Sequence, residues 1–193
     1  NPTDPSIETL NNFNKNCLND VFFALSHGVH RGKLKYSTVD NREKFINKLV
    51  KISKDIKFDI FGINNVQPIW ADQYFKTISN SKMGLNLSRG LPIKYYSSDR
   101  ITQIAGNGLV TLIDEKTGYR DFFNDKEMVF YKNLSDLSEK ISKISHDEKL
   151  RRSIGKNGKN KYLKYFNSTL VAEFIINKCF DINNKNYYLW HNR

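Results

Sequence analysis

Short apolar runs of strand length alternate with helical patterns along most of this 193-residue chain. An apolar run between turn residues is typical of a buried strand, and apolar residues spaced three or four apart are typical of a helix that faces a core. Strands that alternate with helices imply a parallel sheet with right-handed crossovers. We therefore predict an α/β fold: a doubly wound, Rossmann-like parallel sheet of about five strands with helices on both faces. The expected strands are 21–25, 58–61, 82–87, 109–113 and 128–131.

The two ends of the chain differ from its centre in composition. Residues 1–19 are rich in Asn and contain two Pro, so we expect a linker or an entering segment there. Residues 20–180 carry the strand and helix patterns and form the predicted domain. Residues 181–193 are rich in Asn and aromatic side chains and form a tail. Because the chain opens on polar Asn1 without an initiator Met, we expect it to be a domain from a longer protein.

The chain carries no sign of a membrane span or of an export signal. No apolar run approaches the length that crosses a bilayer, and the start has neither a basic region nor an apolar signal segment. We expect no transmembrane segment and a cytoplasmic location, with peripheral attachment to the inner face of the membrane left open. Cys17 and Cys179 are far apart and the four histidines are scattered. We therefore expect two reduced thiols, no metal site and no cofactor.

The net charge is strongly positive, at +11 from 31 basic and 20 acidic residues. Such a balance is typical of proteins that bind nucleic acid, an anionic membrane or a phosphate group. The Lys residues are spread along the predicted helices, and Lys, Asn and Ile recur throughout the chain. A general bias of composition explains the charge equally well, so the charge alone does not select a partner.

Three cations lie around one predicted strand end and helix start. Arg89, Lys94 and Arg100 follow the expected strand at 82–87, and a short helix that ends at Gly108 comes next. Ligands of open α/β sheets bind at the carboxyl ends of the strands, and a helix N-terminus attracts anions. The segment therefore predicts a site for a phosphate-bearing ligand.

Other residues of this segment have polar or aromatic side chains suited to the same ligand. Ser97 or Ser98 is expected to cap the helix, and Ser97 is placed in the binding set. Gln103 lies one turn into the helix, close enough to hydrogen-bond a ribose hydroxyl. Tyr95 and Tyr96 could flank a base or a sugar ring, and core packing is the alternative for one of the two.

The loop after the first expected strand is a second candidate. Gly28 and Gly32 allow tight turns, and Arg31 and Lys33 could reach a diphosphate. The loop is neither a P-loop nor a Gly-x-Gly-x-x-Gly fingerprint. The alternative is a solvated basic loop without a ligand. When the loop is considered together with the Arg89 segment, the two interpretations carry equal weight.

The sequence contains no clear motif for a general acid or base, and the catalytic residue is left unknown. His27 or His30 could titrate near neutral pH, but neither belongs to a recognisable triad. Asp114 and Glu115 follow the fourth expected strand at the same sheet edge, and we interpret them as a surface pair.

These motifs, in their order along the chain, resemble the C-terminal half of GT-B glycosyltransferases. The resemblance is strongest to the spore-maturation-protein-like branch of the group 1 glycosyl transferases, and it covers about residues 20 to 180. The motifs that carry it are Asp40-Asn41-Arg42-Glu43, Leu85-Asn86-Leu87-Ser88, Arg100 through Gly108, Tyr131 through Leu137, and Arg151-Arg152-Ser153-Ile154 with Gly158.

The resemblance implies that residues 20–180 are a nucleotide-sugar-binding domain. The diphosphate of a nucleoside diphosphate sugar would contact Arg31 and Lys33, and the diphosphate and nucleoside would contact Arg89, Lys94 and Arg100. A family Glu that holds the ribose falls on Gln103, which can bond the hydroxyls only without charge. The catalytic base would lie in a missing N-terminal domain of the same protein, and the acceptor would be a sugar or a lipid-linked molecule. The chain alone would then be inactive.

Two other functions stay open at this point. A basic nucleic-acid-binding module would need a broad basic face with stacking aromatic residues. An inactive transferase-like scaffold would bind no donor, and the neutral Gln103 favours that alternative.

Overall fold

A five-stranded parallel sheet forms the centre of the molecule. The computed structural model describes residues 1–25, 40–183 and 186–191. The strand order is β2-β1-β3-β4-β5, and every neighbouring pair is parallel. The predicted α/β, Rossmann-like fold is therefore confirmed. The strands are β1 (Asn19–Ala24), β2 (Phe58–Phe61), β3 (Ser81–Asn86), β4 (Val110–Asp114) and β5 (Val129–Tyr131).

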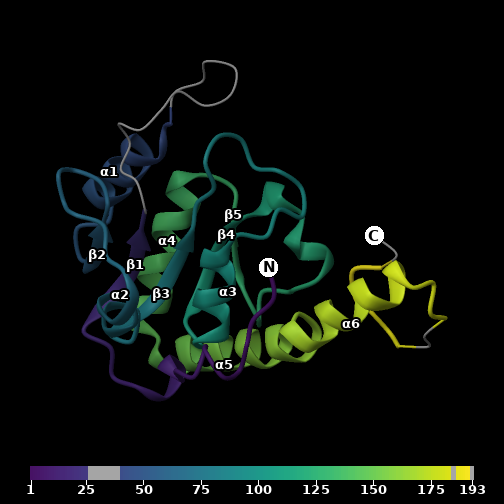
Figure 1. Cartoon of the computed structure of the whole chain (residues 1–193). Helices are drawn as coiled ribbons and strands as arrows, with labels where there is room; N and C mark the ends of the chain where they lie inside the picture. The colour runs from purple at the N-terminus through teal and green to yellow at the C-terminus, as the bar shows by residue number, and fades with distance from the viewer. Residues whose placement is uncertain (26–39, 184–185, 192–193) are drawn as a thin grey trace.

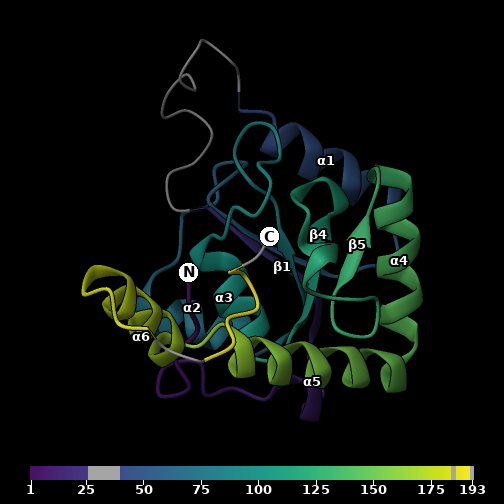
Figure 2. The same cartoon turned by 90° about the vertical axis from the view of Figure 1, so that its right-hand side faces the viewer.

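Helices cover both faces of this sheet (Figures 1 and 2). α1 and α4 lie on one face, α2 and α3 lie on the other, and α5 runs beneath the amino ends of the strands. α6 extends away from the sheet. The helices are α1 (Arg42–Ile52), α2 (Ala71–Ile78), α3 (Asp99–Gly106), α4 (Leu134–His146), α5 (Glu148–Tyr165) and α6 (Ser168–Cys179), with short 3-10 helices η1 (Asn12–Asn14), η2 (Glu115–Thr117) and η3 (Tyr119–Asp121).

The alternation of side chains along β1 explains the two layers. Val21 and Phe23 belong to the core under α1 and α4, whereas Phe22 packs on the opposite face with Ile78 of α2 and Ile104 of α3. All three β1 side chains are almost fully buried. A strand that is covered on both faces has a continuous run of apolar residues, and the run at 21–25 predicted β1 for this reason.

The caps of three helices show how their starts are stabilised. Asp40 followed by Glu43 is a pattern typical of a capping box, but Asn41 is the N-cap of α1 and makes no side-chain capping bond. The Asp40 carboxylate instead accepts hydrogen bonds from the backbone N–H and the guanidinium of Arg42. Ser135 is a residue type that often caps a helix, but Asn133 caps α4 by accepting a 3.0 Å bond from Asp136 N–H. Asp147 caps α5 by accepting a 2.8 Å bond from Leu150 N–H.

The segment that precedes the sheet packs against it. Asn12 is buried, and its side-chain amide donates to the carbonyls of Ile78 and Ser81. Arg151 of α5 holds the same segment through bonds to the carbonyls of Asn12 and Lys15. In the described part of the chain, no helix combines the length and the apolar character that crossing a membrane requires.

The order of the strands creates one topological switch point. β1 lies between β2 and β3, so the connections that leave β1 and β2 turn to opposite sides of the sheet. In sheets of this order a crevice opens at the carboxyl ends of the two strands on either side of that point. Here these strands are β1 and β3.

Candidate functional site

A cavity of about 490 Å³ lies at this switch point. Its walls come from the end of β1, the start of α2, the residues just before α3 and the first turn and a half of α3. We call it the switch-point crevice and define it by Ala24, Tyr74, Tyr96, Arg100 and Gln103.

Two helices begin at the switch-point crevice. Trp70 is the N-cap of α2 and Ser98 is the N-cap of α3, and both residues line the cavity. Neither makes a side-chain bond to the first N–H groups of its helix. Free N–H groups and the positive end of a helix dipole favour an anionic ligand. Asp99 contributes an opposing charge, and its carboxylate accepts a hydrogen bond from the side-chain amide of Asn1.

Arg100 joins the two strands that flank the switch point. Its guanidinium donates to the carbonyl of Leu87 at 3.0 Å, just beyond β3, and to the carbonyl of Ala24 at 3.1 Å, at the end of β1. It also lies over the Phe23 ring, 5.1 Å from the centroid. Burial lowers the pKa of Arg100 from its ordinary value. Since a guanidinium has five N–H groups, three remain beyond these two bonds for a ligand.

Gln103 and Tyr74 add neutral polar groups to the same wall. Gln103 is half-buried and follows Arg100 by nearly one helical turn, so both side chains line the crevice. Burial raises the pKa of Tyr74 to about 12, and its phenol therefore stays protonated at neutral pH. Its ring packs edge-on against Phe22 at 5.3 Å between centroids.

Two exposed aromatic residues stand at the crevice. Trp70 is 58% exposed and Tyr96 is 50% exposed, so both can stack on a flat group. Tyr95 instead packs on Phe122, with 5.0 Å between the ring centroids. Core packing was the alternative expected for one of the two tyrosines, and Tyr95 adopts it. Trp70 was not among the residues predicted from the sequence. Its position directly before a predicted helix, in the loop that follows the second strand, is the signal that could have identified it.

The remaining predicted site residues lie elsewhere. Arg89 approaches Asp40, with 3.7 Å from its Nε to a carboxylate oxygen, and Lys94 lies over the Tyr95 ring at 4.7 Å. Neither lines the switch-point crevice. Ser97 is adjacent to it, and its hydroxyl lies 3.4 Å from the Asn1 carbonyl. Arg31, Lys33, His27 and His30 lie outside the described residues. The structure thus brings Arg100 and Gln103 together and separates them from Arg89 and Lys94.

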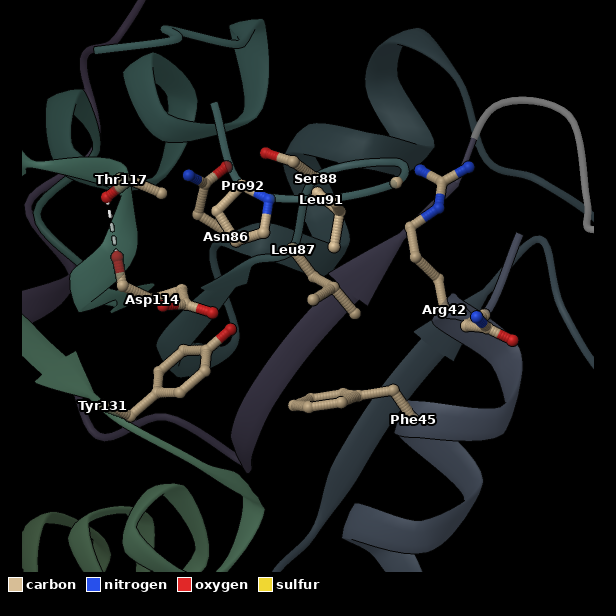
Figure 3. Close-up of a pocket in the computed structure, with 12 residues that line it drawn as sticks. Arg42, Phe45, Asn86, Leu87, Ser88, Leu91, Pro92, Asp114, Thr117 and Tyr131 are labelled. Atoms are coloured by element: carbon tan, nitrogen blue, oxygen red, sulfur yellow. Dashed lines mark hydrogen bonds between the residues drawn. The ribbon is translucent and has the colours of Figure 1, made fainter. Parts of the chain in front are cut away.

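A second cavity, of about 400 Å³, opens at the carboxyl ends of β3, β4 and β5 (Figure 3). Phe45 of α1, Asn86 and Leu87 at the end of β3, Asp114 at the end of β4 and Tyr131 at the end of β5 line it. Asp114 was interpreted as part of a surface pair, and it instead faces this cavity.

The sequence matches the family model described as glycosyl transferase-like over residues 42–177. The chain belongs to this family. The match includes β2 to β5 and the crevice residues Tyr74, Tyr96, Arg100 and Gln103. No curated protein matches the sequence.

Several solved structures have a similar fold. TarM of S. aureus superposes with a TM-score of 0.60 at 14% identity, over 85% of this chain and 36% of TarM. Sucrose-phosphate synthase from Thermosynechococcus elongatus gives 0.56 at 12% identity, over 93% of this chain and 49% of that protein. HepE from Anabaena, in complex with UDP, superposes with a TM-score of 0.55 at 8% identity, over 72% of this chain and 36% of HepE. The glycosyl transferase-like chain therefore spans between about a third and a half of the length of these proteins.

Proposed function

We propose that this chain is the donor-binding domain of a GT-B glycosyltransferase, and that it binds a nucleoside diphosphate sugar in the switch-point crevice. The observation that carries this proposal is the joint position of Arg100, Gln103 and two helix N-termini at the switch point. The structure of HepE, a protein of similar fold, contains UDP, which supports a nucleotide as the ligand.

Each part of the crevice has a role in this proposal. The guanidinium of Arg100 and the free N–H groups at the start of α3 would bind the diphosphate. The same groups would stabilise the charge that develops on the leaving diphosphate when the sugar is transferred. Gln103 would hydrogen-bond the ribose hydroxyls, and Trp70 and Tyr96 would stack on the base.

The complete reaction requires more than this crevice. We propose that the chain is the C-terminal half of a longer enzyme, of the spore-maturation-protein-like branch. A second domain would supply the acceptor site and the catalytic base. The share of TarM and of HepE that the chain covers, 36% in each case, supports this arrangement. We expect the chain alone to bind the donor and to transfer no sugar.

Gln103 gives the cleanest test of the proposal, because no described residue bonds its side-chain amide and its replacement should not disturb the fold. Isothermal titration with UDP, GDP and ADP, each against its nucleoside, should show that the diphosphate strengthens binding by about ten- to hundred-fold. Gln103→Ala should weaken the binding of that nucleotide by about three- to ten-fold, through the loss of a neutral hydrogen bond. Gln103→Glu should bind at least as tightly as the wild type, because a carboxylate accepts from ribose hydroxyls more strongly. Gln67→Ala, an exposed Gln outside the crevice, is the matched control.

Two results would contradict the proposal. If none of the three diphosphates binds at millimolar concentration, the chain is an inactive transferase-like scaffold. If single-stranded oligonucleotides bind tightly with a steep dependence on salt, and Gln103→Ala leaves that binding unchanged, the protein is a nucleic-acid-binding module.

A further inference from the structure

The second cavity belongs to the opposite face of the sheet from the switch-point crevice. Its walls come from α1 and from the loops that follow β3 and β4, and its floor is the end of β5. A volume of about 400 Å³ is within the range of small-molecule sites.

Tyr131 places an unpartnered hydroxyl in this cavity. The side chain is 1% exposed, and its hydroxyl makes no hydrogen bond with any described residue. Figure 3 shows that hydroxyl directed into the cavity, on the same side as the Asp114 carboxylate. Burial, reinforced by the nearby Asp114, raises the pKa of Tyr131, so the phenol remains a donor at neutral pH. A buried hydroxyl without a partner is unfavourable, and a ligand in the cavity would remove that penalty.

The other polar groups at this end of the cavity are held in place by local bonds. One Asp114 carboxylate oxygen accepts a 2.9 Å bond from Lys116 N–H, and the Asp114 carbonyl accepts one from the Thr117 hydroxyl. The Asn86 side-chain carbonyl accepts a 3.0 Å bond from the Ser98 hydroxyl. These bonds fix the orientation of the carboxylate and of the amide, so a ligand would meet preorganised groups.

The opposite wall is apolar and partly flat. The Phe45 ring lies 6.3 Å from the Tyr131 ring, with 36° between their planes. Leu87, Leu91 and Pro92 continue this wall. A ligand that fits both walls has a flat apolar face and an edge that carries several hydroxyl groups.

The charges of the cavity favour a neutral ligand. Asp114 would repel an anion, and the one basic residue among the described lining, Arg42, is already bound by Asp40 through contacts of 2.6 and 2.9 Å. The hydrogen bonds from Arg42 also hold the pKa of Asp40 below its ordinary value. Both side chains therefore stay charged at neutral pH, and their charges offset each other.

We infer that the second cavity binds a neutral pyranose ring. The C–H face of the ring packs on Phe45 and Leu87, one sugar hydroxyl donates to Asp114, and another accepts from Tyr131. The site does not require a nucleotide. The bond between Asn86 and Ser98 nevertheless connects it to the switch-point crevice, because Asn86 lines the cavity and Ser98 lines the crevice.

The test is a titration of the isotope-labelled 193-residue chain, followed by nuclear magnetic resonance, with the methyl glycosides of glucose, galactose and N-acetylglucosamine. At least one of them should shift the signals of Phe45, Leu87 and Tyr131 in the absence of nucleotide. Tyr131→Phe should weaken that binding by about three- to ten-fold, since it removes one hydrogen bond. It should leave the melting temperature unchanged or raise it, because the hydroxyl has no partner in the described protein. Tyr187→Phe, at a 70% exposed tyrosine, is the matched control.

Three results would overturn the inference: no shift at these residues with any of the sugars, equal sugar binding by Tyr131→Phe and the wild type, or binding of choline in place of the sugars. UDP titrations of Tyr131→Phe keep the two sites apart, because we expect nucleotide binding to stay at the wild-type level. A failure of sugar binding with intact UDP binding would reject this site alone.

Discussion

Arg100 shows most clearly how a single residue joins structure to the proposed site. The sequence predicted Arg100 only as a ligand of the diphosphate and nucleoside. The structure gives it a second role, because its guanidinium holds the carbonyls of Ala24 and Leu87 at the ends of two strands. A loss of nucleotide binding in an Arg100 variant would therefore not separate the two roles, and Gln103 is the better probe of the ligand.

We predict that Arg100→Ala lowers the free energy of unfolding by about 2–4 kcal/mol, since two partly buried carbonyls lose a charged partner. Arg100→Lys should recover only part of this loss, because an ammonium cannot reproduce the planar geometry of the guanidinium. Urea denaturation measures both values. Arg120→Ala is the control: its ion pair with Asp125 is exposed, and its loss should cost about 1 kcal/mol or less. Equal stability of Arg100→Ala and the wild type would show that the bonds to the strand ends contribute nothing.

At the scale of elements, two glycines allow α5 to pack directly on the main chain. A Cβ atom on Gly158 would lie 2.3 Å from the carbonyl oxygen of Glu127, just before β5. A Cβ atom on Gly155 would lie 2.6 Å from the carbonyl oxygen of Gly108, just before β4. α5 can therefore run beneath the amino ends of these strands, as Figure 1 shows, only because these positions have no side chain.

We predict that Gly158→Ala destabilises the protein by about 1–3 kcal/mol, although Ala is the better helix former by about 1 kcal/mol. The clash involves backbone and cannot be relieved by rotating a side chain, so it outweighs the gain in helix propensity. Asn160→Ala, at an exposed position of the same helix, should be neutral or slightly stabilising. Thermal denaturation of the two variants decides the matter, and a higher melting temperature for Gly158→Ala would refute this view of the α5 contact.

At the scale of the whole molecule, hydrogen bonds and ion pairs hold several carboxylates ionised. Burial alone would raise the pKa of Asp20, but hydrogen bonds from Lys82, Ser145 and the Lys57 N–H lower it overall. The bonds from Lys82 and Ser145 join β1 to β3 and α4. Within α5, the Arg151 guanidinium likewise lowers the pKa of Glu148, and the same guanidinium donates to the Asn12 carbonyl of the segment that precedes the sheet.

The pH dependence of stability follows from these shifts. A carboxylate with a lower pKa in the folded state stabilises the protein above the pKa of the unfolded chain, and the contribution disappears as the pH falls through the folded value. The pKa values that apply to the unfolded chain are 3.8 for Asp20 and Asp40 and 4.5 for Glu148. We predict a nearly constant urea midpoint from neutral pH to about pH 5 and a steady fall below it. Asp20→Asn should lower the midpoint at neutral pH and flatten the fall. Half-buried Asp59, whose pKa is raised by partial burial, acts in the opposite direction, and a midpoint that rises in acid would mean that Asp59 dominates.

Local sequence patterns predicted the class of fold and the order of the strands and helices along the chain. These features depend on local patterns, because the period of apolar residues and the turn residues between them are set within a few neighbouring positions. The grouping of the cations, in contrast, depends on contacts between distant parts of the chain. Arg89, Lys94 and Arg100 lie within twelve residues of one another, yet Arg89 turns to Asp40, Lys94 to Tyr95 and Arg100 to Ala24. The second cavity is of the same kind, since Phe45, Asp114 and Tyr131 meet through the packing of α1 on the sheet. In a loop, the partners that fix the direction of a side chain come from distant parts of the chain, and no local pattern contains them.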